Sequence, residues 1–254
     1  MTPLELWDLR VGSGILWDWT GRDEFGRVLR ESLTLLQSGS GETRSGGPVP
    51  QSIRGFSGVY FTGGGAAAIE SSFGDCPWDV WFAANGRSAA ELGGTSLLAA
   101  HGLAGWVVDL GQSALKVFVA GRCRVFPRDY AALPVRGDDA SDIVLQRKAL
   151  REFVASSLLA CVADGWMAPE AIVCALPSSL DDSGVPEGSS YIGMKGDASL
   201  IADSLARSGL APQLVLLLND AELAAVSAGL DPRVRGKVLV LTIGFGVGAA
   251  LLQA

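Results

Sequence analysis

Two acidic residues in this chain of 254 residues each stand at the end of an apolar run. Asp109 ends "GWVVD", and Asp220 follows "PQLVLLLN" and opens "AELAAVSAGL". The turn after Asp109 contributes Gly111, Gln112, Ser113 and Lys116. Gly-containing turns between strands offer N–H donors and room for a triphosphate, and a carboxylate at the carboxyl edge of a sheet can take a proton from a hydroxyl. Phosphoryl transfer needs these groups and little covalent help.

Two further glycine clusters follow predicted strands. Gly63, Gly64 and Gly65 lie in "YFTGGGAAAI", and Gly244, Gly246 and Gly248 lie in "LTIGFGVGAAL". Any one of these clusters by itself is typical of a hairpin turn. Three clusters at the ends of predicted strands favour a nucleotide site.

The residues that would act on an acceptor have simpler alternative roles. Asp220 is either a general base or the N-cap of the helix that it opens. Asn219 either orients a hydroxyl group or belongs to a turn. In the loop 178–197, Ser178, Asp181, Asp182, Ser189, Ser190 and Tyr191 either face an acceptor or belong to a solvated surface loop.

The elements that must position these residues form a repeated order. From Gly105, the patterns predict three strands and then a helix over "SDIVLQRKALREFVASSLLACVADGW", with Ser141 or Asp142 as its N-cap. A strand at 171–177 and a helix that stops at Gly209 follow. A strand over "PQLVLLLND" and a last helix complete the unit. The apolar run in "PQLVLLLND" predicts a strand covered on both faces. This order is βββαβαβα, which is typical of a ribonuclease-H-like unit.

A second unit of the same order is predicted if the end of the chain is joined to its beginning. Residues 237–244 and 247–254 supply its first two strands, and "LELWDLR" and "GILWDWT" are alternative third strands. A helix over "RDEFGRVLRESLTLL", strands in "GVYFTGGGA" and "WDVWFAANG", and helices in "AAIESSFG" and "RSAAELGGTSLLAAHG" complete it. The fold class is therefore α/β with two lobes, residues 103–236 and residues 1–102 plus 237–254.

These motifs resemble those of the actin, hexokinase and Hsp70 (ASKHA) superfamily of ATP-binding proteins. "DLGQSALK" resembles its first phosphate loop, "LTIGFGVGAAL" its second phosphate loop and "YFTGGGAAAI" its adenosine loop. "LLLNDAELAAVSAG" resembles the Asn-Asp-Ala segment of repressor/ORF/kinase (ROK) sugar kinases, whose Asp is the catalytic base. The motifs occur here in circularly permuted order, which implies a permuted actin-like ATPase fold with an ATP cleft between its lobes.

The resemblance implies a role for each motif. Asp109 would hold Mg²⁺ through water. The β- and γ-phosphates of ATP would lie beside Gly111, Gln112 and Ser113, with Lys116 nearby, and would face Gly244, Gly246 and Gly248. Gly63, Gly64 and Gly65 would lie against the ribose and the α-phosphate. Asp220 would be the base, and the acceptor, a sugar or a sugar-like molecule, would contact Asn219, Ser178 and Asp181.

The chain also departs from the family pattern. Phe245 replaces a small hydroxyl residue, Gln112 and Ala114 replace the common Gly and Thr, and the ROK zinc cluster and Glu-x-x-His sugar segment are absent. Three hypotheses therefore stand: a small-molecule kinase, a non-kinase ATP-binding regulator or scaffold, and an actin-like filament former. Acceptor-dependent turnover separates the first two, and ATP-dependent sedimentation would identify the third.

Composition narrows the partners and the compartment. The net charge of −7 and a pI near 4.8 argue against nucleic acid as the main partner. With neither a signal peptide nor an apolar run of membrane-spanning length, we expect a cytoplasmic protein without a membrane span. The four cysteines lack metal spacing and are expected to be buried, and His101 is expected to be structural. Trp7, Trp17 and Trp19 would either pack in the core or form a homodimer surface.

Overall fold

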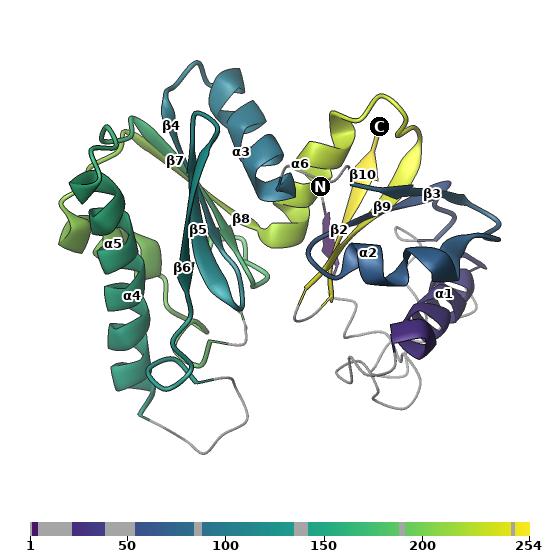
Figure 1. Cartoon of the computed structure of the whole chain (residues 1–254), viewed down its shortest axis with the longest axis horizontal. Coiled ribbons are helices and arrows are strands. Elements are labelled where there is room, and N and C mark those ends of the chain that lie inside the picture. Colours follow the sequence, from purple (N-terminus) through teal and green to yellow (C-terminus); the bar gives the residue numbers. More distant parts are fainter. Residues whose placement is uncertain are drawn as a thin grey trace. The chain divides into compact units, whose positions relative to one another are not determined.

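The computed structural model describes residues 2–4, 22–38, 54–83, 88–134, 142–187, 191–244 and 247–254. Its contacts divide the chain into two compact units (Figure 1). Unit 1 contains residues 1–93 and 221–254, and unit 2 contains residues 94–220. Both units are mixed α/β structures, and each contains one five-stranded sheet.

The sheet of unit 2 has the strand order β6-β5-β4-β7-β8. Its strands are β4 (Gly105–Leu110), β5 (Ala114–Val119), β6 (Arg122–Pro127), β7 (Ala171–Leu176) and β8 (Leu214–Asn219). β4, β5 and β6 form an antiparallel meander, whereas β4, β7 and β8 run parallel. β4 is central and almost wholly buried, which explains why its sequence lacks the alternation of a one-sided strand.

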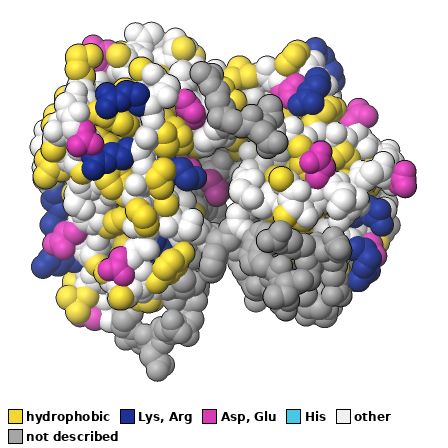
Figure 2. Space-filling view, viewed as in Figure 1, with side chains coloured by type: hydrophobic (Ala, Val, Ile, Leu, Met, Phe, Trp, Pro, Cys, Tyr) yellow, Lys and Arg dark blue, Asp and Glu magenta, His cyan; other side chains and the backbone are white. Residues whose placement is uncertain are grey.

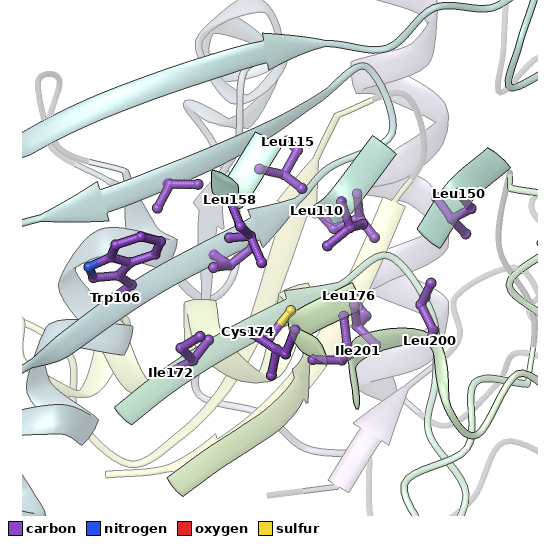
Figure 3. Close-up of a cluster of buried hydrophobic side chains, with 14 of the residues drawn as sticks. Trp106, Leu110, Leu115, Leu150, Leu158, Ile172, Cys174, Leu176, Leu200 and Ile201 are labelled. Carbon is purple, nitrogen blue, oxygen red and sulfur yellow. The ribbon is translucent and has the colours of Figure 1, made fainter. Parts of the chain in front are cut away.

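Two helices cover one face of this sheet, α4 (Ile143–Ala163) and α5 (Leu200–Ser208). Asp142 caps α4, because its side chain accepts a hydrogen bond of 2.9 Å from the Val144 N–H. α5 ends before Gly209, whose φ of 71° lies in the left-handed region. Figure 3 shows the resulting core, in which Trp106, Leu110 and Leu115 of the sheet pack with side chains of both helices.

The sheet of unit 1 has the order β1-β10-β9-β2-β3. Its strands are β1 (Thr2–Leu4), β2 (Gly58–Thr62), β3 (Asp79–Phe82), β9 (Lys237–Ile243) and β10 (Val247–Gln253). β1, β10 and β9 are antiparallel neighbours, and β9, β2 and β3 run parallel. β9 is therefore equivalent to β4 of unit 2. Each of these strands has two strands in antiparallel pairing on one side and two strands in parallel pairing on the other.

In unit 1, helices cover both faces of the sheet. α1 (Arg22–Ser38), α2 (Ala66–Ile69) and the 3₁₀ turn Glu70–Phe73 enclose one core, in which Phe61 packs against Phe73 and Phe82. On the other face, the alanines of α6 (Asp220–Gly229) pack against Tyr60, Val238 and Val240. Small side chains allow α6 to lie close to the sheet.

The unit boundaries fall within or beside two helices. α3 (Ala89–Ala100) follows β3 of unit 1, but its Gly94 lies against Val107 of unit 2. α6 follows β8 of unit 2 but packs on the sheet of unit 1. The sequence predicts unit boundaries after residues 102 and 236, which would place α3 with the sheet of unit 1 and α6 with the sheet of unit 2. In the structure the boundaries fall after residues 93 and 220.

Three expectations about single elements change. All six residues of β8 are only half-buried, because β8 is an edge strand rather than one covered on both faces. The third strand of the unit 1 sheet is Thr2–Leu4, which precedes most of "LELWDLR"; residues 5–21, including Trp7, Trp17 and Trp19, lie outside the described residues. Cys161 and Cys174 are buried as expected, but Cys123 is exposed and Cys76 is partly exposed.

Lys and Arg side chains on the face shown in Figure 2 lie in small groups among acidic and hydrophobic side chains. Within the described ranges, none of the helices has the length and apolar character needed to span a bilayer. His101 lies exposed in the turn that follows α3.

Candidate functional site

The carboxyl edge of the unit 2 sheet brings several predicted site residues together. β4, β7 and β8 run parallel, and their register pairs Asp109 with Ala175 and Leu176 with Asn219. Asn219 ends β8, Asp220 follows it, and Ser178 follows β7, so all three residues lie at the same edge as the turn after β4. Ligands of open α/β sheets bind at such an edge.

Asp109 lies at this edge in an ion pair with its cross-strand neighbour. Lys116 is opposite Asp109 in the β4–β5 register, and its Nζ lies 3.1 Å from Asp109 Oδ2. The Asp109 side chain is 12% exposed and that of Lys116 is 38% exposed. The pair fixes one carboxylate oxygen of Asp109, so its other oxygen, Oδ1, is the one available to a hydrated cation.

Three backbone carbonyl groups of the turn 111–113 point toward the protein interior. The Gly111 oxygen accepts a hydrogen bond of 2.8 Å from the Tyr191 hydroxyl. Arg128 Nη1 donates to the Gln112 oxygen at 3.0 Å, and the Arg128 backbone N–H donates to the Ser113 oxygen at 2.9 Å. In this turn, therefore, every carbonyl group has a donor.

The orientation of these carbonyl groups also determines that of the N–H groups. In a trans peptide, the C=O of one residue and the N–H of the next point in opposite directions. The Gln112 and Ser113 N–H groups consequently point away from the donors of Arg128 and Tyr191. No hydrogen bond between described residues uses either N–H. The turn thus presents adjacent donors, which is the arrangement that binds phosphate oxygens.

Arg128 and Tyr191 are themselves buried, with exposed fractions of 4% and 2%. The Arg128 guanidinium lies 3.8 Å from the centre of the Tyr191 ring. Burial raises the pKa of the Tyr191 hydroxyl to about 12, although the neighbouring Arg128 lowers it. Burial lowers the pKa of Arg128. The Tyr191 hydroxyl is therefore protonated, as its role as a donor to Gly111 requires.

The predicted acceptor residues make hydrogen bonds within the protein. Asn219 Nδ2 donates to the Ser178 oxygen at 2.8 Å, which joins β8 to the segment after β7. Ser178 is buried, and its hydroxyl donates to the Ser179 oxygen at 2.8 Å. Asp181 Oδ1 accepts from the Ser183 and Val185 N–H groups at 2.8 and 2.9 Å, so this carboxylate closes its own turn.

Asp220 is the first residue of α6 and is partly exposed. The N-terminal turn of a helix favours a carboxylate, because the helix dipole is positive there. This position suits a negatively charged base as well as a structural helix start.

The glycine turns of unit 1 lie next to each other. Gly63 has a φ of 93°, and a Cβ at this position would be 2.4 Å from the Ile243 oxygen. The Gly65 N–H donates to the same Ile243 oxygen at 2.8 Å. The turn after β2 is thereby held against the end of β9, where Gly244 follows.

Gly64 and Gly244 are exposed, and among the described residues no atom outside the adjoining residues lies within 4 Å of a Cβ built on either glycine. The backbone there is accessible to a ligand. Gly248 is in β10 opposite Thr242, whereas Gly246 and Phe245 lie outside the described residues.

The donor set fits Mg²⁺ held mainly by water and phosphate. Among the described residues, no three His, Cys, Asp or Glu side chains gather into a group that could hold a metal ion. Mg²⁺ commonly binds through one or two carboxylates, waters and substrate phosphates. The carboxylate of Asp109 beside the turn 111–113 meets this requirement.

The sequence analysis did not identify Arg128 as a site residue, and it did not predict the contact of Tyr191 with the turn 111–113. Arg128 follows an edge strand, where an exposed charged residue is common, and nothing in the local pattern distinguishes it. For Tyr191 the sequence left open whether it faces an acceptor or belongs to a solvated surface loop; in the structure it is buried, and its hydroxyl donates to the turn after β4. The two residues are separated in the chain from this turn and meet it only in the fold.

No protein-family profile and no curated protein matches this chain. Among solved structures, the chain is similar to an inorganic polyphosphate/ATP-glucomannokinase from Arthrobacter sp. strain KM, with 22% sequence identity and a TM-score of 0.40. The match covers 57% of this chain and 57% of the kinase chain. A likeness this weak carries no argument about fold or activity.

Proposed function

We propose that this chain is an ATP-dependent phosphotransferase that transfers a phosphoryl group to the hydroxyl of a sugar or a sugar-like molecule. The carboxyl edge of the unit 2 sheet carries the proposal. There, a turn with inward carbonyl groups follows the carboxylate of Asp109, and a second carboxylate, Asp220, begins a helix after β8. Phosphate-binding N–H groups and a base at one edge are the components that phosphoryl transfer requires.

Each residue then has a specific task. The Gln112 and Ser113 N–H groups donate to phosphate oxygens, and Asp109 holds Mg²⁺ through water. Bound Mg²⁺ neutralises part of the charge on the phosphates. Asp220 accepts the proton of the attacking hydroxyl, and Asn219 positions the helix start that carries Asp220 through its hydrogen bond to Ser178.

We further propose that the chain is a circular permutation of an actin-like ATPase fold. Support comes from the strand orders, because both sheets have equivalent pairings when one is read from β9 and the other from β4. β1 lies antiparallel to β10, with Thr2 opposite Leu251, so the first and last strands of the chain are neighbours like the two strands of a hairpin.

The alternative function is that of an ATP-binding regulator or scaffold without kinase activity. The acceptor side favours it, because Ser178 and Asp181 both make internal hydrogen bonds. Residues occupied in this way are less available to a sugar. In that case, ATP would bind but no acceptor would increase its turnover.

The test is ADP release from MgATP, measured with hexoses, amino sugars and polyols as acceptors. We expect one of these classes to stimulate release, and Asp220→Asn to reduce the stimulated rate by at least about a hundredfold, because a positioned base contributes 10²–10⁴. The affinity for ATP should stay within about twofold, because Asn keeps the shape of Asp.

Glu222→Gln is the matched control, since it removes the other carboxylate from the first turn of the same helix. ATP binding without stimulation by any acceptor would reject the kinase in favour of the regulator. Wild-type rates in Asp220→Asn would reject this residue as the base.

A further inference from the structure

We infer that Arg128 and Tyr191 are positioning residues that set the phosphate affinity of the turn 111–113. The inference rests on the proposed ATP binding but assigns a role to two residues that take no part in the chemistry. Neither residue is expected to touch ATP. Their contacts are with the carbonyl groups on the opposite side of the turn.

The guanidinium of Arg128 connects the turn 111–113 with the segment Leu133–Pro134. Its Nε donates to the Leu133 oxygen at 2.8 Å, Nη1 to the Gln112 oxygen at 3.0 Å, and Nη2 to the Pro134 oxygen at 2.7 Å. A planar guanidinium with donors in fixed directions can hold several carbonyl groups in one geometry, which the single ammonium of lysine cannot do.

Aromatic rings hold this guanidinium in place. The Tyr191 ring lies 3.8 Å from the guanidinium carbon, and the Tyr130 ring lies at 5.3 Å. Tyr191 makes the second connection, because its hydroxyl donates to the Gly111 oxygen at 2.8 Å. Tyr191 belongs to the segment between β7 and α5, and Arg128 follows β6, so two segments that are far apart in the sequence fix the turn.

Fixing the carbonyl groups has a direct effect on binding. If the peptides at Gly111 and Gln112 could rotate, their following N–H groups would no longer converge on one phosphate oxygen. The protein would then have to order the turn at the moment of binding, which costs affinity. Donors that are already oriented avoid this cost. The effect is specific to ligands whose phosphates reach the turn.

The experiment compares the affinities of ATP and AMP, measured calorimetrically in the presence of Mg²⁺. AMP lacks the β- and γ-phosphates that the turn is proposed to hold. Tyr191→Phe removes one hydroxyl and keeps the ring over Arg128. We expect it to weaken ATP binding by about three- to tenfold, as loss of one hydrogen bond predicts, and to leave AMP binding within about twofold.

Tyr130→Phe is the matched control, because it removes a hydroxyl from the other ring beside Arg128, in a residue that is half-exposed. We expect it to leave both affinities unchanged. Arg128→Lys serves as the second variant: it keeps the charge but loses the fork of donors, and should reduce the ratio of ATP to AMP affinity at least as much as Tyr191→Phe.

The outcomes separate this inference from the proposed function. Selective loss of ATP affinity in both variants, with thermal unfolding still cooperative, supports the inference. An unchanged ratio of affinities in Tyr191→Phe and Arg128→Lys overturns it while leaving ATP binding intact. Wild-type protein that does not bind ATP overturns the proposed function, and the inference with it.

Discussion

At the scale of the residue, the candidate site depends on buried polar groups that bond to backbone rather than to ligand. The Tyr191 hydroxyl and the Arg128 guanidinium both lie behind the turn after β4. A buried donor that lost its acceptor would cost about 1–3 kcal/mol, so these contacts constrain the turn and the side chains together. One prediction at this scale concerns the Tyr191 hydroxyl at alkaline pH, and the other concerns the methyl group that Gly63→Ala adds.

Alkaline pH should destabilise the protein through Tyr191. Burial raises the pKa of its hydroxyl from 10.0 to about 12, so the folded chain keeps a proton that the unfolded chain releases between these values. The unfolding free energy therefore falls as pH rises from 10 toward 12, by on the order of 2 kcal/mol. Urea unfolding at pH 8 to 11.5 should show a smaller fall in Tyr191→Phe.

Two cysteines contribute to the same pH range in both proteins. Burial raises the pKa of Cys161 to about 11 and that of Cys174 to about 12. Their effect cancels when the variant is compared with the wild type. Parallel pH profiles of the two proteins would show that the Tyr191 hydroxyl is not buried as described.

Gly63→Ala should destabilise unit 1. The residue has a φ of 93°, and its new Cβ would be 2.4 Å from the Ile243 oxygen. We expect a loss of about 1–3 kcal/mol in unfolding free energy, measured by urea denaturation. Gly64→Ala is the control, because in the described part of the chain no atom beyond the adjoining residues would lie within 4 Å of its Cβ. Equal stability of the two variants would contradict the close packing of this turn.

At the scale of the element, an ion pair joins α4 to the start of α5. Arg151 donates to Asp197 through Nη2 at 2.6 Å and through Nε at 3.1 Å. The Asp197 side chain is almost fully buried, and its neighbour Ser199 also donates to Asp203 at 2.9 Å. The pair holds the segment that leads from Tyr191 into α5, so the position of Tyr191 depends on how these two helices pack.

Asp197→Ala should therefore lower the unfolding free energy by about 2–4 kcal/mol, because Arg151 would lose a bidentate partner in a largely buried position. Chemical denaturation measures this loss. Glu152→Ala is the comparison on the same helix, since the exposed pairs of Glu152 with Lys148 and with Arg207 of α5 should together contribute less than about 1 kcal/mol. A similar loss in both variants would show that the burial of Asp197 adds nothing to the pair.

At the scale of the whole molecule, the order of the elements along the chain is separate from their arrangement in the sheets. β1 and β10 are paired, although they lie at opposite ends of the sequence (Figure 1). The turn at 101–104 joins α3 to β4 and is largely exposed. Circular permutation tolerates exposed turns and neighbouring ends of this kind.

A rearranged chain tests this reading. The rearranged protein begins at Leu103 and ends at Gly102, and a short Gly-containing linker joins Ala254 to Met1. We expect this protein to fold cooperatively. Its ATP affinity should stay within about threefold of the wild-type value, since every strand keeps its neighbours. Circular dichroism and calorimetry measure both properties. A control chain opened inside α4, between Val154 and Ala155, should not fold, because both residues are buried.

The sequence by itself determined most of the elements. Apolar runs and helical spacing predicted the strands around Asp109 and before Asp220, and Asp142 was identified as a possible N-cap that the structure confirms. These predictions succeed because hydrophobic periodicity and capping depend on neighbours within a few residues. The positions of the glycine turns at strand ends followed from the same local patterns.

Only the tertiary structure decided how these elements support a site. β8 has a continuous apolar run, yet its place at a sheet edge leaves it half-exposed. Arg128 and Tyr191 have no local pattern that connects them with Gly111 and Gln112, because their contacts join segments far apart in the chain. Such contacts depend on strand order and helix packing, which hydrophobic periodicity does not encode.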